Sequence, residues 1–324
     1  MIGRRRTLAV LAGAAACAPA IAAPPPAAES AYDEPADIFR ALATQPRMTL
    51  SVGERTIDVV FAEGAPDVDR AQVLAWIHKS AMAVTTYFGV FPVRRVGLLV
   101  VGQDGDRVGH GTTYGFQGSA IRIHVGRSAG DEAFGRDWVL VHEMTHLALP
   151  RVPRRSLWLQ EGNATYLEPI ARAQAGQLEP ATVWKWSIEG MPKGEPGPGD
   201  QGLDRTPTWG RTYWGGAMFW LVADIAIHRR TNGRHSLQEA LRAINRASGG
   251  NTANWSSGEV MAAGDAPTGT DVLQALYDSW KETPVTVDLA ATFKDLGVAE
   301  ADGRVVFDED APLADFRRQL TRRS

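Results

Sequence analysis

The sequence has almost no cysteine and little net charge. Its 324 residues include one cysteine, Cys17, and the formal net charge is −3. A nearly neutral chain gives no sign of a nucleic-acid partner or of an anionic membrane surface. A chain cleaved after Cys17 has no thiol, which excludes disulfides and leaves only nitrogen and oxygen ligands for a metal site. With 44% hydrophobic and 22% charged residues, the composition is typical of a globular protein.

Long apolar runs are also absent, apart from one near the first residue. Three arginines at 4–6 precede an Ala-rich apolar segment, 7–23, whose last residues are small enough for a cleavage site. This segment is too short for a good membrane span. We therefore expect a signal peptide over 1–23 and an exported protein, periplasmic or secreted, with no transmembrane span in the mature chain. The alternatives are a lipid anchor at Cys17 and a disordered Ala-rich tail.

Composition and periodicity divide the rest of the chain into four parts. Residues 24–46 are expected to form a mobile Pro/Ala-rich linker. Residues 47–150 mix strand and helix patterns, residues 151–300 are mainly helical, and residues 301–324 are taken as a C-terminal tail. This order predicts an α+β fold, in which an N-terminal α/β lobe with a small sheet packs on a C-terminal α-helical lobe.

Apolar periodicity also places the individual elements. Strands are predicted at 48–52, 57–61, 95–101 and 121–125, and helices at 67–88, 131–149, 156–167, 212–230 and 271–281. Ser236 and Glu239 form a capping box that begins one more helix. The predicted helix over 156–167 is expected to end before Pro169. The Gly-rich stretches 102–118 and 171–209 are expected to be loops.

The strongest motif is His-Glu-Met-Thr-His at 142–146. Residues four apart share a helix face, so the two imidazoles can converge on one ion, while Glu143 is rotated about 100° from His142 and can reach water beside that ion. No other residue in 138–149 is ionisable, and burying three such groups in an apolar helix is costly unless they are compensated. A divalent cation compensates them. The alternative is two core histidines bonded to carbonyls, with Glu143 at the surface.

A third ligand is needed, because a catalytic zinc has three protein ligands and one open position. Glu161 lies fifteen residues after His146, which allows a turn and an antiparallel return helix. Gly162 leaves room for close helix packing beside it. The apolar flank at 157–159 argues against the alternative, an ordinary exposed glutamate. We therefore expect the metal ligands to be His142, His146 and Glu161.

These residues resemble a known family. His-Glu-x-x-His followed by Glu-Gly-x-Ala-x-Tyr at 161–166 is similar to the gluzincin metallopeptidases of the MA clan, most of all to the catalytic domain of their glycyl aminopeptidase branch. The runs 213–217 and 233–237 add to the likeness, which covers roughly residues 55–300. The resemblance implies a thermolysin-like fold, one zinc ion per chain between the two lobes, and a peptide or protein substrate. It also implies that Tyr213 stabilises the oxyanion; the alternative is a packing aromatic at a helix start.

The chemistry expected from this resemblance is hydrolysis of a peptide bond by a zinc-activated water, with Glu143 as general base. Aminopeptidases of this clan hold the free amine of the substrate with an acidic residue before the metal helix, but residues 107–130 contain no Asp or Glu. The choice between aminopeptidase and endopeptidase therefore stays open. His110 and His124 lie in this stretch, and we expect them to be polar strand or loop residues first and substrate contacts second.

Two other classes of protein compete with a peptidase. One is a catalytically inert, zinc-containing protein of the same fold that holds a peptide, although such a protein has no need of a general base at Glu143. The other is a periplasmic scaffold with accidental histidines. The sequence predicts nothing about the oligomeric state.

Overall fold

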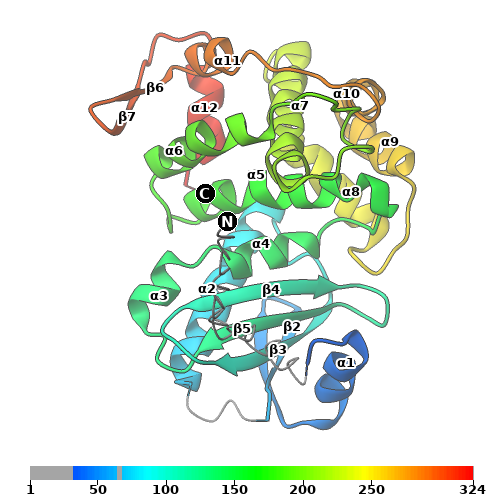
Figure 1. The fold of residues 1–324 in the computed structure, drawn as a ribbon, viewed down its shortest axis with the longest axis vertical. Coiled ribbons are helices and arrows are strands. Elements are labelled where there is room, and N and C mark those ends of the chain that lie inside the picture. Colours follow the sequence, from blue (N-terminus) through cyan, green and yellow to red (C-terminus); the bar gives the residue numbers. More distant parts are fainter. Residues whose placement is uncertain (1–31, 64–67, 324) are drawn as a thin grey trace, which may run out of the picture.

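The structure is a computed structural model, and it describes residues 32–63 and 68–323. The predicted signal peptide, Cys17 and the first residues of the predicted linker lie outside the described residues. Figure 1 shows two lobes, one built around a sheet and one built mainly of helices. The mixed α/β architecture expected from the sequence is therefore confirmed. None of the helices in the described part of the chain has the length and apolarity needed to cross a bilayer.

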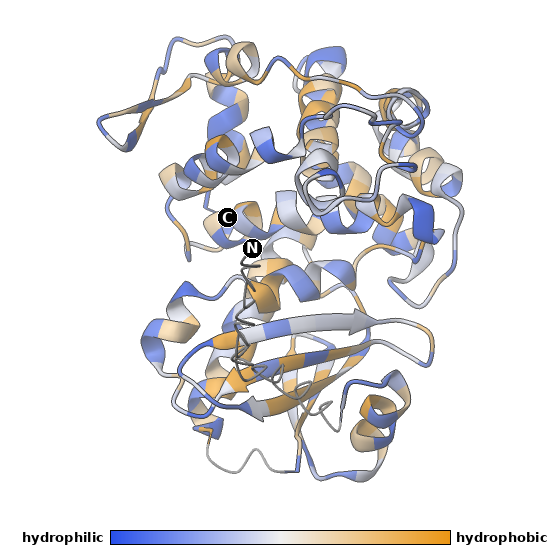
Figure 2. Cartoon of the chain, in the orientation of Figure 1, coloured by the Kyte–Doolittle hydropathy of each residue, from blue (hydrophilic) through white to orange (hydrophobic). Residues whose placement is uncertain are grey.

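The sheet has five strands in the order β1-β2-β3-β5-β4. The strands are β1 (Arg47–Val52), β2 (Arg55–Phe61), β3 (Arg95–Gln103), β4 (Val108–Tyr114) and β5 (Ala120–Gly126). β1 and β2 form the predicted antiparallel hairpin around Gly53, whose φ of 59° suits glycine. β2, β3 and β5 run parallel, and β4 closes the sheet as an antiparallel edge strand. Figure 2 shows apolar residues concentrated on the inner strands of the sheet, whereas the edge strand β4 is mostly pale or hydrophilic.

The edge strand β4 is a correction to the sequence analysis, which assigned 102–118 to a loop. Its glycines hide the strand pattern, because glycine is normally depleted in strands. Gly111 is required by the packing, since a Cβ there would lie 2.5 Å from Cγ of Glu143. The strand is irregular, with a register shift between Val108 and Gly111. A glycine within a strand marks such a bulge or a close approach.

Helices cover both faces of the sheet. Helix α2 (Arg70–Phe88) begins at Asp69, whose carboxylate accepts hydrogen bonds from two backbone N–H groups. Its predicted apolar stripe is fully buried in the main core, at Val73, Ile77, Ala81 and Val84. On the other face, Ile38 and Ala41 pack with Val60 and Leu99. They belong to helix α1 (Pro35–Thr44), so the expected mobile linker is wrong over these residues, because this ten-residue helix buries an apolar pair.

The predicted helix over 131–149 is split in two. Helix α3 (Asp131–Arg136) ends at Asp137, and helix α4 (Val139–His146) begins two residues later. The Asp137 carboxylate accepts hydrogen bonds from the N–H groups of Val139 and Leu140 and from the indole of Trp76. It therefore caps the second helix and ties it to α2, which holds the predicted metal helix in place.

The second lobe is helical, as expected. After the short turn η1 (Arg154–Ser156), its helices are α5 (Trp158–Gln174), α6 (Pro180–Gly190), α7 (Gly216–Thr231), α8 (Leu237–Ser248), α9 (Ser257–Thr268), α10 (Val272–Trp280) and α11 (Leu289–Asp295). The predicted capping box at Ser236 and Glu239 is present. The predicted end of α5 before Pro169 is wrong, since the helix continues to Gln174. Ile170, Ala171 and Ala173 are buried in the core, and this burial offsets the hydrogen bond lost at proline.

Two further expectations are corrected in this lobe. The predicted loop 171–209 contains α6 and the turn η2 (Met191–Gly194), because Val183 and Trp184 are buried against the lobe. The predicted tail 301–324 is folded: a hairpin of β6 (Val298–Ala301) and β7 (Arg304–Phe307) leads to helix α12 (Ala314–Thr321). Phe316 and Leu320 on α12 are buried, so the end of the chain belongs to the core. Neither segment has the long apolar period that reveals a helix.

Helices α5 and α7 cross at two glycines. A Cβ on Gly162 would lie 2.3 Å from the Cα of Gly216, so no side chain fits there. We expect Gly162→Ala to lower the free energy of unfolding by about 2 kcal/mol or more, because overpacking forces backbone shifts. Chemical denaturation measures this. The matched control is Gly258→Ala in α9, where the nearest atom is 4.0 Å away; equal stability of the two variants would contradict the predicted crossing.

Asp224 on α7 is a buried carboxylate that ties two elements together. It accepts hydrogen bonds from the N–H of Leu237 at 3.1 Å and from the hydroxyl of Tyr166 at 3.0 Å. Burial raises the pKa of Asp224 to about 6, although both hydrogen bonds oppose this shift. The folded state therefore holds a proton that the unfolded state has already released, and stability falls as pH rises from about 4 through 6.

Asp224→Asn removes this titration and keeps the shape of the side chain. As the pH rises from 4 to 7, we expect the free energy of unfolding of the wild type to fall relative to that of the variant, by up to about 3 kcal/mol. Urea titrations of both proteins at several pH values measure it. Parallel stability curves for the two proteins would show that the pKa of Asp224 is not raised by folding.

Candidate metal centre

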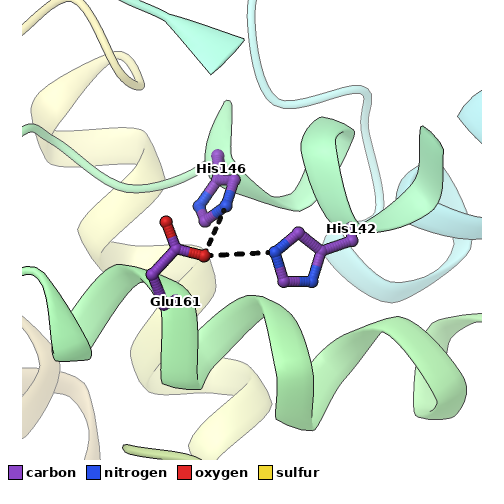
Figure 3. Close-up of side chains that lie close together, drawn as sticks. All are labelled: His142, His146 and Glu161. Carbon is purple, nitrogen blue, oxygen red and sulfur yellow. Dashed lines mark hydrogen bonds and ion pairs between the residues drawn. The ribbon is translucent and has the colours of Figure 1, made fainter. Parts of the chain in front are cut away.

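The three predicted ligands lie together at the boundary between the lobes. His142 and His146 stand one turn apart on α4, and Glu161 lies in the first turn of α5. Figure 3 shows both imidazoles and the carboxylate pointing toward one another. The Nε2 atoms of His142 and His146 lie 3.3 Å and 3.4 Å from Oε2 of Glu161. One ligand atom from each of the three residues lies within 4.8 Å of the others.

This spacing fits a single metal ion. Zinc binds histidine nitrogen and carboxylate oxygen at about 2.1 Å, so neighbouring ligands of one tetrahedral ion lie about 3.4 Å apart. The two nitrogen-to-oxygen distances match that value. The ligand set contains two imidazoles and one carboxylate and no thiol, which is the composition expected of a catalytic rather than a structural zinc site. The residues therefore fit the ion that the sequence predicts.

Charge in the centre is also suited to a cation. Burial alone raises the pKa of Glu161, but His146 and His142 lower it far more, so the net pKa of this carboxyl is well below its ordinary range. The carboxylate is thus ionised at any ordinary pH. Burial lowers the pKa of His146, whereas Glu161 and Glu143 raise it, and the net shift is upward. The negative charge of two glutamates dominates the surroundings of this imidazole.

Glu143 lies beside the triad and is not part of it. Its side chain is buried rather than at the surface. The hydroxyl of Thr113 on β4 lies 2.7 Å from Oε2 and 2.8 Å from the backbone carbonyl of Glu143, two acceptors that share its proton. The glycine at position 111 allows the edge strand to approach this side chain closely. Thr113 was not anticipated, because one threonine in a Gly-rich stretch carries no motif. It fixes the orientation of the predicted general base.

Tyr213 comes to the same place from the second lobe. Its ring stacks on His142 with centroids 6.2 Å apart and an angle of 21°. Burial, with the carboxylates of Glu161 and Glu143, raises the pKa of Tyr213 to about 12. The hydroxyl therefore stays protonated and can act as a hydrogen-bond donor. The predicted catalytic tyrosine and the predicted metal ligands are brought together.

A π-helical turn positions Tyr213. The turn η3 (Arg211–Gly215) precedes α7, and single π turns occur frequently at functional sites. Arg211 is buried, forms an ion pair with Asp200 at 2.8 Å and donates a hydrogen bond to the carbonyl of Gly194. The sequence gives no sign of these contacts, since the partners are ten or more residues apart in a stretch expected to be a loop. They anchor the turn on which the tyrosine is placed.

These residues line one cavity of about 330 Å³, between the edge strand and α5. Its lining residues include Gly111, Thr113, His142, Glu143, His146, Arg151, Gln160, Glu161, Tyr213 and Asn251. Glu143 and Glu161 are the acidic residues among those that line it. His110 and His124 do not line it; their rings pack at a tilt with centroids 4.1 Å apart, and their places in β4 and β5 confirm them as strand residues.

Known structures give a further comparison. No protein-family model matches the sequence, and no curated protein matches it. The chain is similar to an aminopeptidase N family protein from Idiomarina loihiensis, with a TM-score of 0.58 and 14% identity, over 78% of this chain and 49% of that one. A weaker likeness, with a TM-score of 0.47 and 16% identity, is to an M1 zinc metallopeptidase from Deinococcus radiodurans, over 75% of this chain and 53% of that one.

The likeness to both structures is one of fold. The chain spans about half the length of both solved structures. Of the two, the Idiomarina loihiensis protein is the more similar in fold, with a TM-score of 0.58. The chain therefore has the fold of about half of an aminopeptidase N family protein, which supports its resemblance to the gluzincin metallopeptidases.

Proposed function

We propose that this chain is a zinc-dependent metallopeptidase that hydrolyses peptide bonds within an extended substrate. One observation carries the proposal: a metal triad, a buried glutamate beside it and a protonated tyrosine line the same cavity. The triad fits one zinc ion. Zinc at this position supplies a Lewis acid for the scissile carbonyl and activates a water molecule near neutral pH.

The protein residues have separate tasks in this reaction. Thr113 holds Oε2 of Glu143, so Oε1 is the oxygen that can take a proton from the attacking water and later give it to the leaving amine. Tyr213 donates its hydroxyl proton to the developing oxyanion in a hydrogen bond. The edge strand β4 offers a glycine-rich backbone to which an extended peptide can add as a further strand.

Action on internal bonds is favoured over aminopeptidase action. An aminopeptidase needs an anion for the α-ammonium group of its substrate. In the cavity, the two acidic residues already have other tasks, one as metal ligand and one as general base, and Arg151 adds a positive charge. A free amine therefore finds no carboxylate of its own among the residues that line the cavity, whereas a neutral internal peptide unit needs none.

The test combines metal analysis with matched peptides. We expect the purified full chain to contain about one zinc per molecule and to cleave N-terminally blocked peptides as fast as free ones. Cleavage of free peptides alone, one residue at a time, would identify an aminopeptidase. A zinc-loaded protein that is inert toward a broad peptide library would favour the peptide-binding alternative, and a protein that takes up no zinc would favour the scaffold.

Removing the Tyr213 hydroxyl is expected to slow the chemical step. We expect Tyr213→Phe to lower kcat by about 10²-fold with little change in KM, because the hydroxyl acts on charge that develops only in the transition state. Zinc content should not change. The control is Tyr114→Phe on β4, whose side chain does not line the cavity. Equal kcat for the two variants would show that the Tyr213 ring only packs on His142.

The location of the protein belongs to the same proposal. Residues 1–23 have the charge and hydropathy pattern of an export signal, so we propose a periplasmic or secreted enzyme. Cell fractionation of a strain that expresses the full sequence tests this, with the processed mass of the exported chain as the measurement. Retention of the uncleaved chain in the cytoplasm would contradict it.

A further inference from the structure

A second cavity of about 540 Å³ lies beside the metal centre. It shares His142 and Tyr213 with the first cavity, so these two side chains lie at the boundary between the two cavities. Its other walls come from the second half of α5, from α6 and from the segment 209–217. Five of the ten tryptophans of the chain line it: Trp138, Trp184, Trp186, Trp209 and Trp214. A cavity lined by this many aromatic rings, beside a predicted metal centre, is typical of a ligand-binding site.

Two of these tryptophans are largely exposed, at 50% for Trp138 and 62% for Trp209. An exposed indole leaves a large apolar surface in water, and apolar residues gathered around a cavity mark a binding site. Both rings touch the reaction centre: Trp209 stacks on Tyr213 at 6.0 Å, and Trp138 meets the ring of His142 edge-on at 5.6 Å. Trp138 and Trp209 therefore place indole surface beside the predicted ligand His142 and the predicted catalytic Tyr213.

The inner wall has a fixed shape. Trp184 is buried in the core of the second lobe. Trp214 lies directly on Gly190, where a Cβ would be 2.1 Å from its ring, so the indole fills the space of the missing side chain. Glu168 also lines the cavity, but Arg172 binds it at 2.7 Å. The other charged groups of the wall are also engaged: Glu189 lies 3.8 Å from Lys185, and the ammonium of Lys193 lies 5.9 Å from the centre of the Trp214 ring. An entering charged group therefore meets aromatic rings and charges that already have partners.

We propose that this aromatic cavity is the specificity pocket of the enzyme, and that it takes a bulky aromatic or aliphatic side chain from the substrate residue next to the scissile bond. The inference rests on the proposed function for its place in the reaction, and on the cavity itself for its chemistry. The pocket selects against glycine, alanine and charged residues at that position. It thus separates this chain from a peptidase that selects glycine.

The first test measures cleavage. Acetylated and amidated peptides of sequence Gly-Gly-X-Gly-Gly, with X as Phe, Leu, Ala or Asp, differ only in the side chain that would enter the pocket. We expect kcat/KM for the Phe peptide to exceed that for the Ala peptide by about 10- to 100-fold, the range set by burial of a few methylene equivalents. Trp186→Ala and Ser187→Phe, which open and fill the cavity away from the metal, should lower this ratio about 10-fold.

The second test measures binding and does not depend on activity. The same peptides are titrated into zinc-loaded Glu143→Gln protein, with quenching of tryptophan fluorescence as the signal. We expect the Phe peptide to bind at least about 10-fold more tightly than the Ala peptide, and Trp186→Ala to remove this preference. The control is Phe116→Ala, an exposed aromatic outside the cavity.

The two readouts separate the proposals. Preferential binding of the Phe peptide without cleavage by the wild-type protein contradicts the peptidase and supports the pocket. Cleavage that is indifferent to X, with equal binding of the Phe and Ala peptides, supports the peptidase and overturns the pocket.

Discussion

Glu143→Gln is expected to lower kcat/KM of peptide hydrolysis by about 10³-fold and to leave the zinc content unchanged, in line with the usual contribution of general base catalysis. The amide has nearly the shape of the carboxylate, and it can still accept the hydrogen bond that Thr113 donates. It cannot accept a proton from water. Since Glu143 lies outside the triad, metal binding should survive the change.

The matched control is Glu132→Gln on α3, where the side chain is 76% exposed. It changes the net charge by the same amount, and we expect both its rate and its zinc content to equal those of the wild type. Peptide cleavage assays with metal analysis on the same samples measure both quantities. A Glu143→Gln protein that keeps its zinc and cleaves at the wild-type rate would remove the proposed base from the mechanism.

The metal triad could be predicted from sequence because its geometry is local. Two histidines four residues apart share a face of any helix, and a short turn returns the chain antiparallel with Glu161 opposite them. Gly162 marked a close helix crossing in the sequence, and the structure places the backbone of Gly216 against it. Such features depend on the helix period and on side-chain size, and the sequence gives both the spacing and the type of the residues.

The rest of the site depends on contacts between distant segments. Thr113 reaches Glu143 because a Gly-rich segment adds to the edge of the sheet, which strand propensity does not indicate. The tryptophans of the second cavity are spread over 138–214, and packing of α5 on α6 and η3 brings them together. Burial likewise keeps α5 helical beyond Pro169, against the local preference of proline.

Loss of the third ligand is the second large effect that we expect. Glu161→Gln keeps the size of the side chain but removes the one negative charge among the three ligands. Even changes at outer partners of metal ligands cost 10- to 100-fold in affinity, so the dissociation constant for zinc should rise by at least about 10²-fold. Activity at limiting zinc should fall in the same proportion, and excess zinc should restore a part of it.

Competition with a chelator of known affinity measures the dissociation constant, and thermal unfolding with and without zinc gives a second readout. Zinc stabilises the wild type by binding only the folded chain, so the shift in Tm on adding zinc should shrink in Glu161→Gln. Glu282→Gln, just after α10, is the control, since its exposed carboxylate pairs with Arg205 and not with the triad. If both variants retain zinc equally under chelation, the third ligand is not Glu161, and the two histidines must bind the metal with a different partner.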